Sequence, residues 1–338
     1  MPSVVAKRLV IAVAVVELVS SLGINGFILA VNVLDWVRGS QLTSCDLLLS
    51  GLSGSQLCRQ WFLMLDCFTV CGYLTMSPLE DWATTVLWQL TSQASLWLAA
   101  CLSLLYFLKI GTFTHPGFMW LKCRVPRLGL QLLLGSLLVS AVSTLTLLLV
   151  ASKAAPWGAF QGESRNFSYL LDWRRKSNIY LPLLLSLQFL LPLSIFLVSI
   201  SLLVRSLLRH VRHMGFLATG HGDPSTKAHI TATKTLVAFL FFYLLFVITN
   251  FLLFALDYPS SPGAFSTNLV LMGACASGNG IFLVLGNSKL RKAAEIKISM
   301  DQTSHDPGSQ LDRALVQNRL PMDQASCQTK LSSRLDFP

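Results

Sequence analysis

Seven long apolar segments run through this chain and are joined by short loops that carry most of its charged residues. A helix rises about 1.5 Å per residue and the hydrocarbon core of a bilayer is about 30 Å thick, so about 20 apolar residues can cross it. Because backbone groups in lipid must bond within their own segment, each segment is expected to be helical. The spans are predicted near residues 9–34, 47–74, 84–108, 128–150, 181–204, 235–256 and 265–286.

The composition supports a membrane location. Only 12% of the residues are charged and 53% are hydrophobic, whereas a typical soluble domain is about 25% charged. A soluble protein with this composition would expose large apolar patches. The sequence therefore predicts an all-α membrane protein, a seven-transmembrane-helix bundle over residues 1–297. The polar segment 298–338 is predicted to be a disordered tail.

The distribution of positive charge predicts the orientation. The loops after the first, third and fifth spans and the segment after the seventh hold the larger share of Lys and Arg. Because cytoplasmic loops are rich in these residues, the N-terminus is predicted outside and the C-terminus in the cytoplasm. The Lys and Arg residues that give the net charge of +10 lie at span ends, where they meet anionic lipid headgroups. No nucleic acid partner is therefore expected. Asn166 begins the only Asn-X-Ser/Thr sequon and lies in a predicted outer loop, which makes it a candidate glycosylation site.

No pattern typical of catalysis or metal binding appears. The chain has no HExxH, GxSxG or Walker-type motif, and its Cys and His residues are not clustered at ligand spacing. The sequence therefore predicts neither an enzyme, nor a cofactor, nor a metal site. A transporter or channel would more often place several charges along its spans, whereas these spans carry Glu17, Arg59 and Asp66.

Charged residues within spans are costly and are therefore functional candidates. Glu17 and Asn25 lie on one face of the first span. They could form either an internal polar switch or a buried hydrogen-bond network that fixes helix packing. Arg59 and Asp66 share one face of the second span. Arg59 is expected near the inner end, where it could snorkel. Asp66, nearer the outer end, either lines a ligand cavity or occupies a partly hydrated surface.

Several short motifs occur in a fixed order along the spans and inner loops. They are Asn25-Gly26-Phe27-Ile28, Asp35-Trp36-Val37, Leu57-Cys58 with Gln60-Trp61, Leu102–Ile110 with Trp120-Leu121-Lys122, Asp223–Ile230 and Leu285-Gly286-Asn287. This set resembles the type 2 bitter taste receptors, a family of seven-helix G-protein-coupled receptors, in all seven spans. The chain also lacks the Asp-Arg-Tyr and Asn-Pro-X-X-Tyr motifs of rhodopsin-like receptors.

The resemblance implies a plasma-membrane receptor for bitter small molecules that couples to a gustducin-type G protein. A receptor of the related pheromone type is the alternative, which the inner-loop motifs disfavour. Ligands of the family lie in the outer half of the bundle. By this resemblance the ligand-binding residues are Trp88, Ser92, Asp66, Phe246, Leu269 and Met272. For Trp88, a packing or interface tryptophan is the alternative.

The resemblance also implies that basic residues of the inner surface contact the G protein, with headgroup anchoring as the alternative for each. These residues are His115, Lys122, Arg209, His210 and Lys227. The chain departs from the family at Gln56, Ala276, Asn279 and Gly280, where the family has an Arg, a Pro and a His-Ser pair. We expect these departures to affect signalling efficiency. Whether the receptor forms oligomers is left open.

Overall fold

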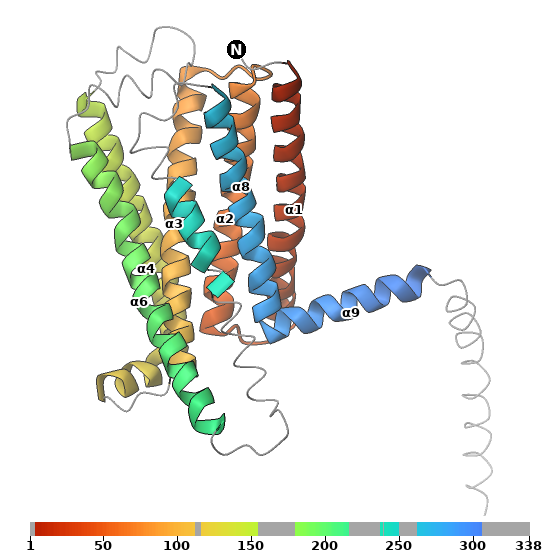
Figure 1. Ribbon diagram of the computed structural model, residues 1–338, viewed down its shortest axis with the longest axis vertical. Helices are drawn as coiled ribbons and strands as arrows, with labels where there is room; N and C mark the ends of the chain where they lie inside the picture. The colour runs from red at the N-terminus through yellow and green to blue at the C-terminus, as the bar shows by residue number, and fades with distance from the viewer. Residues whose placement is uncertain are drawn as a thin grey trace, which may run out of the picture. The chain divides into compact units, whose positions relative to one another are not determined.

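In a computed structural model of the chain, the regular secondary structure is entirely α-helical within the described residues, 4–111, 116–154, 180–215, 237–238, 240–249 and 262–305. The chain divides into two compact units, Met1–Gly286 and Asn287–Pro338. The first unit contains α1 (Val4–Val37), α2 (Ser44–Val70), α3 (Pro78–Ile110), α4 (Pro116–Ala154), α6 (Tyr180–Gly215) and α8 (Pro262–Gly286), and the second contains α9 (Ser288–His305) (Figure 1). A shorter apolar helix, Leu240–Thr249, belongs to the first unit.

Four helices in the described part of the chain are long and apolar enough to cross a membrane. Their apolar segments are Lys7–Val37, Trp82–Lys109, Leu128–Leu149 and Leu187–Ser206. The number is five if Val270–Gly286 and Ser288–Ser299 are counted as one broken span. This is a membrane-type helical bundle, while seven spans and their orientation stay predictions. The α2 helix is not among these segments, because polar residues such as Gln56, Arg59 and Gln60 lower its hydropathy.

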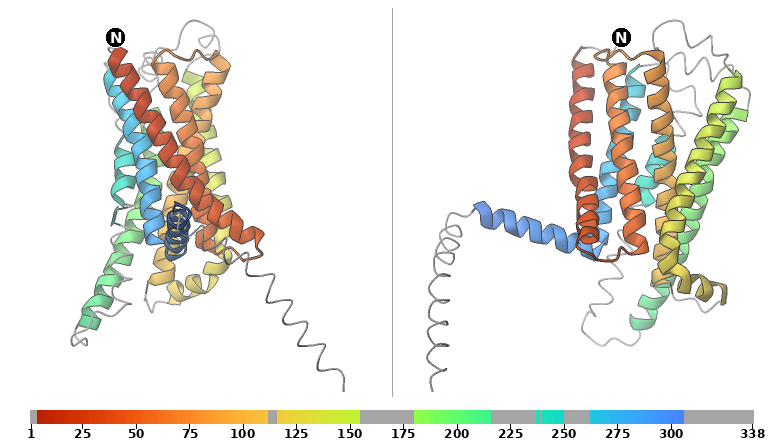
Figure 2. Two further views of the ribbon diagram at one scale, coloured as in Figure 1. Left: turned by 90° about the vertical axis from the view of Figure 1, so that its right-hand side faces the viewer. Right: turned by 180° about the vertical axis from the view of Figure 1, so that it is seen from behind.

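The α2 helix occupies the middle of the first unit, where it packs against α1, α3, α4 and α8. Figure 2 shows α1, α2, α3 and α8 running side by side. Polar side chains join these helices: Asn32 Nδ2 on α1 donates to Ser50 Oγ at 2.9 Å, and Ser55 Oγ and Ser95 Oγ lie 2.9 Å apart. In lipid, helices gain little from apolar burial, so close packing and such hydrogen bonds hold them together.

A glycine permits the closest approach of α4 to the start of α2. Ser44 Oγ donates to the carbonyl of Val125 at 2.7 Å and accepts from the backbone N–H of Gly129 at 3.2 Å. A Cβ atom at Gly129 would lie 2.5 Å from Ser44 Cα. Any larger residue at position 129 would therefore separate the two helices and break both hydrogen bonds.

A capping box stabilises the N-terminus of α2, and another stabilises the N-terminus of α3. Thr43 Oγ1 accepts from the N–H of Asp46 at 3.2 Å, and Asp46 Oδ2 accepts from the N–H of Thr43 at 3.1 Å. Ser77 and Glu80 repeat this pattern before α3. The hydrogen bonds from Ser77 hold the pKa of the Glu80 carboxyl below its usual value. These boxes satisfy backbone donors that the first helical turn leaves open.

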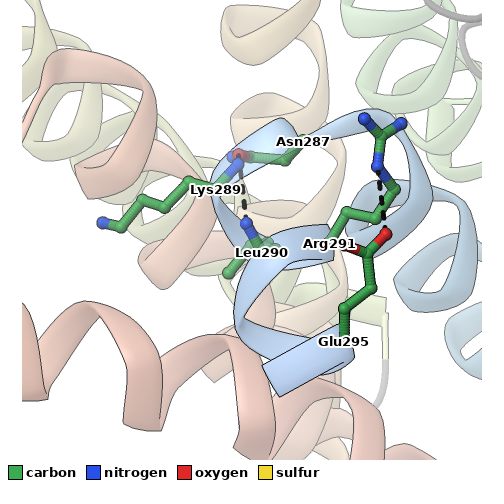
Figure 3. A network of polar contacts seen from close by, with 5 residues as sticks. All are labelled: Asn287, Lys289, Leu290, Arg291 and Glu295. Atoms are coloured by element: carbon green, nitrogen blue, oxygen red, sulfur yellow. Dashed lines mark hydrogen bonds and ion pairs between the residues drawn. The ribbon is translucent and has the colours of Figure 1, made fainter. Parts of the chain in front are cut away.

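In the second unit, Asn287 caps α9. Its Oδ1 accepts from the N–H of Lys289 at 3.0 Å and of Leu290 at 3.5 Å, and Arg291 Nε lies 3.7 Å from Glu295 Oε1 one turn later (Figure 3). The α9 helix continues to His305, past the predicted boundary at residue 298. Residues 306–338 lie outside the described residues, so the disordered tail stays a prediction.

The capping box of α2 gives a first testable prediction. Replacing Thr43→Ala removes the acceptor for the Asp46 N–H and is expected to lower the free energy of unfolding by about 1 kcal/mol. Thermal unfolding of the purified protein in detergent measures this loss. Thr146→Ala is the matched control, because the Thr146 hydroxyl bonds only to the Val142 carbonyl within α4. An equal loss in both variants would contradict the proposed role of the cap.

Candidate functional site

Two residues of the predicted ligand site, Trp88 and Met272, meet in one hydrophobic cluster. Trp88 on α3 is 7% exposed and Met272 on α8 is 2% exposed. Four further buried residues complete this cluster, Ala14 from α1 and Leu63, Met64 and Cys67 from α2. Four helices therefore contribute to one apolar centre around the indole of Trp88, which we call the Trp88 cluster.

Three other predicted ligand contacts lie within one turn of a cluster member on the same helix. Ser92 lies one turn after Trp88 on α3, is buried, and its Oγ has no hydrogen-bond partner among the described residues. Asp66 is half-buried on α2 and precedes Cys67, a member of the cluster. Leu269 lies on α8, one turn before Met272.

The sixth predicted contact, Phe246, has a different neighbour. Its ring lies under the guanidinium of Arg59, with 4.3 Å between Arg59 Cζ and the ring centroid. Arg59 is 4% exposed and lies near the middle of α2, Ser44–Val70. The expectation that Arg59 snorkels from the inner end is therefore wrong. The sequence pattern missed this because the burying surface comes from Phe246, a residue far away along the chain.

The Glu17 carboxylate lies against α8 at Gly273, a residue without a side chain. Its Oε2 contacts the position that a Cβ of Gly273 would occupy, and Gln60 Nε2 of α2 lies 3.1 Å from the same position. One turn after Gly273, Ser277 Oγ donates to the backbone carbonyl of Glu17 at 3.5 Å. Gly273 is therefore required so that the carboxylate of α1 can reach the interior.

Two turns further along α1, Asn25 also lies close to a glycine of α8. Its Nδ2 donates to Ser21 Oγ at 3.1 Å, and its Oδ1 lies 3.3 Å from the position that a Cβ of Gly280 would occupy. Gly280, one of the departures from the family pattern, thus makes room chiefly for Ile24, whose Cγ2 would lie 2.7 Å from such a Cβ, and also for the Asn25 amide. Both side chains are buried, but Glu17 Oε2 and Asn25 Oδ1 have no hydrogen-bond partner among the described residues, so the polar switch and the packing network both stay predictions.

A buried glutamine cluster that the pattern of charged residues does not predict lies between α3, α4 and α6. Gln188 Oε1 accepts from Gln89 Nε2 at 3.3 Å and from Gln93 Nε2 at 3.4 Å. Gln188 Nε2 donates to the carbonyl of Ser143 on α4 at 2.9 Å. A search for charged residues in the spans passes over these uncharged amides. The occurrence of glutamine within otherwise apolar segments is the sequence signal that predicts such a cluster.

On the side predicted to face the cytoplasm, Lys122 has a structural contact. Its Nζ donates to the carbonyl of Gly111 at the end of α3 at 3.0 Å and lies 5.7 Å from the centroid of Phe118. Arg209 is exposed on α6, and His210 lies on the same helix. His115, Lys227 and the candidate glycosylation site Asn166 lie outside the described residues. Within the described residues, no three His, Cys, Asp or Glu side chains are grouped so as to hold a metal ion.

The model of a family described as "Taste receptor protein (TAS2R)" matches residues 1–301. A protein named taste receptor type 2 member 7 from Rattus norvegicus is 35% identical over 287 residues, 83% of this chain and 91% of that protein. Proteins with the same name from Papio hamadryas and Mus musculus are 34% and 33% identical, covering 80% and 82% of this chain and 86% and 89% of their own lengths.

The contact between Glu17 and Gly273 gives a second prediction. Gly273→Ala places a methyl group against the carboxylate and is expected to destabilise the fold by about 1–3 kcal/mol. Thermal unfolding in detergent measures the loss. Gly26→Ala is the matched control, because no atom lies within 4 Å of a Cβ at that position.

A double variant identifies the colliding group. If Glu17 causes the loss, Glu17→Ser combined with Gly273→Ala is less destabilised than the sum of the two single variants, because the shorter side chain leaves room for the methyl group. Strict additivity of the two losses would show that the methyl group collides elsewhere.

Proposed function

Because this chain belongs to the TAS2R family of taste receptors, we propose that it is a G-protein-coupled receptor that detects bitter small molecules and signals through a gustducin-type G protein. The observation that carries this proposal is the family match over residues 1–301, which includes every helix of the first unit. The family is one of receptors and not of enzymes.

The proposed receptor crosses the plasma membrane seven times, with its N-terminus outside and its C-terminus in the cytoplasm. Four or five apolar helices in the described residues and the excess of Lys and Arg in the predicted inner loops support this topology. Asn166 would then face the exterior, where it can be glycosylated. Residues 1–297 would form the receptor domain, and residues 298–338 a cytoplasmic tail.

We assign ligand binding to the Trp88 cluster and its border. A buried indole beside Met272, with Ser92 and Asp66 nearby, combines a large apolar surface with few polar groups. Sites of this composition suit small, mainly apolar molecules, because apolar contact supplies affinity and a few polar groups fix orientation. Phe246 and Leu269 complete the proposed set.

Signalling requires that the ligand binds the active arrangement of helices more tightly than the inactive one. To change a population from 1:99 to 99:1, this preference must reach about 10⁴-fold, or about 5.5 kcal/mol. The proposed G-protein contacts are His115, Lys122, Arg209, His210 and Lys227. Lys122 also holds the end of α3 through Gly111, so its replacement would alter the inner surface as well as remove a charge.

The function is tested in cells that express the chain with a promiscuous G protein. Bitter compounds are expected to release calcium, and untransfected cells are expected not to respond. Absence of any response despite surface expression would contradict the proposed function.

The ligand site is tested with Trp88→Ala. Loss of the indole removes the largest apolar surface of the cluster, and the potency of agonists is expected to fall by about ten-fold or more, equivalent to about 1.4 kcal/mol. Trp61→Ala is the matched control, because Trp61 is 52% exposed on α2. If Trp88→Ala reaches the surface and keeps full potency for every agonist, the assignment of the site is wrong.

The topology is tested with epitope tags at the two ends. An N-terminal tag is expected to stain intact cells, whereas a C-terminal tag is expected to stain only after permeabilisation. Equal staining of both tags on intact cells would exclude an odd number of spans, because an odd number places the two ends on opposite sides.

A further inference from the structure

Arg59 is a charged residue in the interior of the first unit. Its side chain is 4% exposed, and it lies near the middle of α2, which packs against α1, α3, α4 and α8. Removing a guanidinium from water is costly unless an anion or several hydrogen-bond acceptors replace the water. The position of Arg59 therefore raises the question of what balances its charge.

Within the described residues, nothing that carries a negative charge contacts Arg59. Among the described residues, an ion pair joins Arg291 to Glu295, and both of these residues belong to the second unit. Glu17 places its carboxylate against Gly273 instead. The contact with Phe246 at 4.3 Å is attractive, but a phenyl ring has no formal charge and no lone pair.

Arg59 also lies next to the proposed ligand site. Leu63, one turn later on α2, is a member of the Trp88 cluster, and the partner ring, Phe246, is itself a proposed ligand contact. A small molecule that rests on these apolar residues can therefore present a polar group to the guanidinium. Five N–H donors in a planar fork match a carboxylate better than any neutral group.

We infer that Arg59 binds an anionic group of the ligand, so that this receptor recognises small aromatic or aliphatic acids, with the carboxylate at Arg59 and the apolar body against Phe246 and the Trp88 cluster. This inference rests on the proposed function and names the ligand class of the same site. The charge of the ligand compensates the buried guanidinium, and the apolar residues around it exclude water and strengthen the ion pair.

The test uses pairs of compounds that differ only in charge: benzoate and methyl benzoate, and 2-naphthoate and methyl 2-naphthoate. Calcium release gives the potency of each compound, and the ratio of acid to ester potency is compared within each variant, which cancels differences in expression. The acids are expected to be the more potent members in the wild type. Arg59→Gln is expected to lower the ratio by about ten-fold or more, equivalent to about 1.4 kcal/mol.

Two further variants sharpen the test. Arg59→Lys keeps the charge but loses the planar fork, so its ratio is expected to lie between those of the wild type and Arg59→Gln. Arg124→Gln is the matched control: Arg124 also stacks on an aromatic ring, with its Cζ 3.9 Å from the Trp120 centroid, but it is exposed on α4. Its ratio is expected to equal that of the wild type.

A binding measurement separates this inference from the proposed function. 2-Naphthoate is expected to raise the melting temperature of the purified wild-type protein and not that of Arg59→Gln, whether or not signalling occurs. If bitter compounds release calcium but the acid-to-ester ratio is the same in the wild type and Arg59→Gln, the function stands and the inference is wrong. That result is expected if water molecules satisfy Arg59. If neither compound class releases calcium from a well-expressed receptor but naphthoate still stabilises it through Arg59, the function fails and the anion site stands.

Discussion

The need to satisfy polar groups inside a bundle that faces lipid organises this structure. Lipid offers no hydrogen bonds to α2, whose central part carries Gln56, Arg59 and Gln60, so the helix is surrounded by four others. The Ser55–Ser95 contact and the Asn32–Ser50 hydrogen bond then define which faces meet. Gly129 allows α4 to approach the start of α2 closely enough for the two hydrogen bonds of Ser44.

The same constraint shapes the candidate site. Glu17 from α1 occupies the space left by Gly273, and Ile24 and Asn25 occupy the space left by Gly280, so the two glycines allow α1 and α8 to approach closely. Arg59 has an aromatic ring but no anion among the described residues. The interior therefore combines a closely packed apolar centre at Trp88 with a charge whose compensation the ligand is proposed to supply.

Much of this arrangement could be predicted, for reasons that differ between residues. The length of the apolar segment 84–108 predicts a span, and α3 contains it, because crossing lipid imposes a length on any sequence. Trp88 and Met272 were paired through the family resemblance, since they are far apart in the chain and no local pattern connects them. The pattern of charged residues does not predict the role of Gln188, because its amide carries no charge. The pattern of α2 alone predicts that Arg59 snorkels, whereas neighbouring helices bury it in the structure.

The sequence by itself determined that the chain is a helical membrane protein, because the backbone in hydrocarbon has no alternative to helices over such long apolar segments. It also determined where helices begin, through local boxes such as Thr43 with Asp46. Only the tertiary structure decided which polar residues are buried and against what: Glu17 against Gly273, Arg59 against Phe246, and Gln188 between three helices. These contacts join residues distant along the chain, and helical periodicity gives the face of a residue but not the helix that covers it.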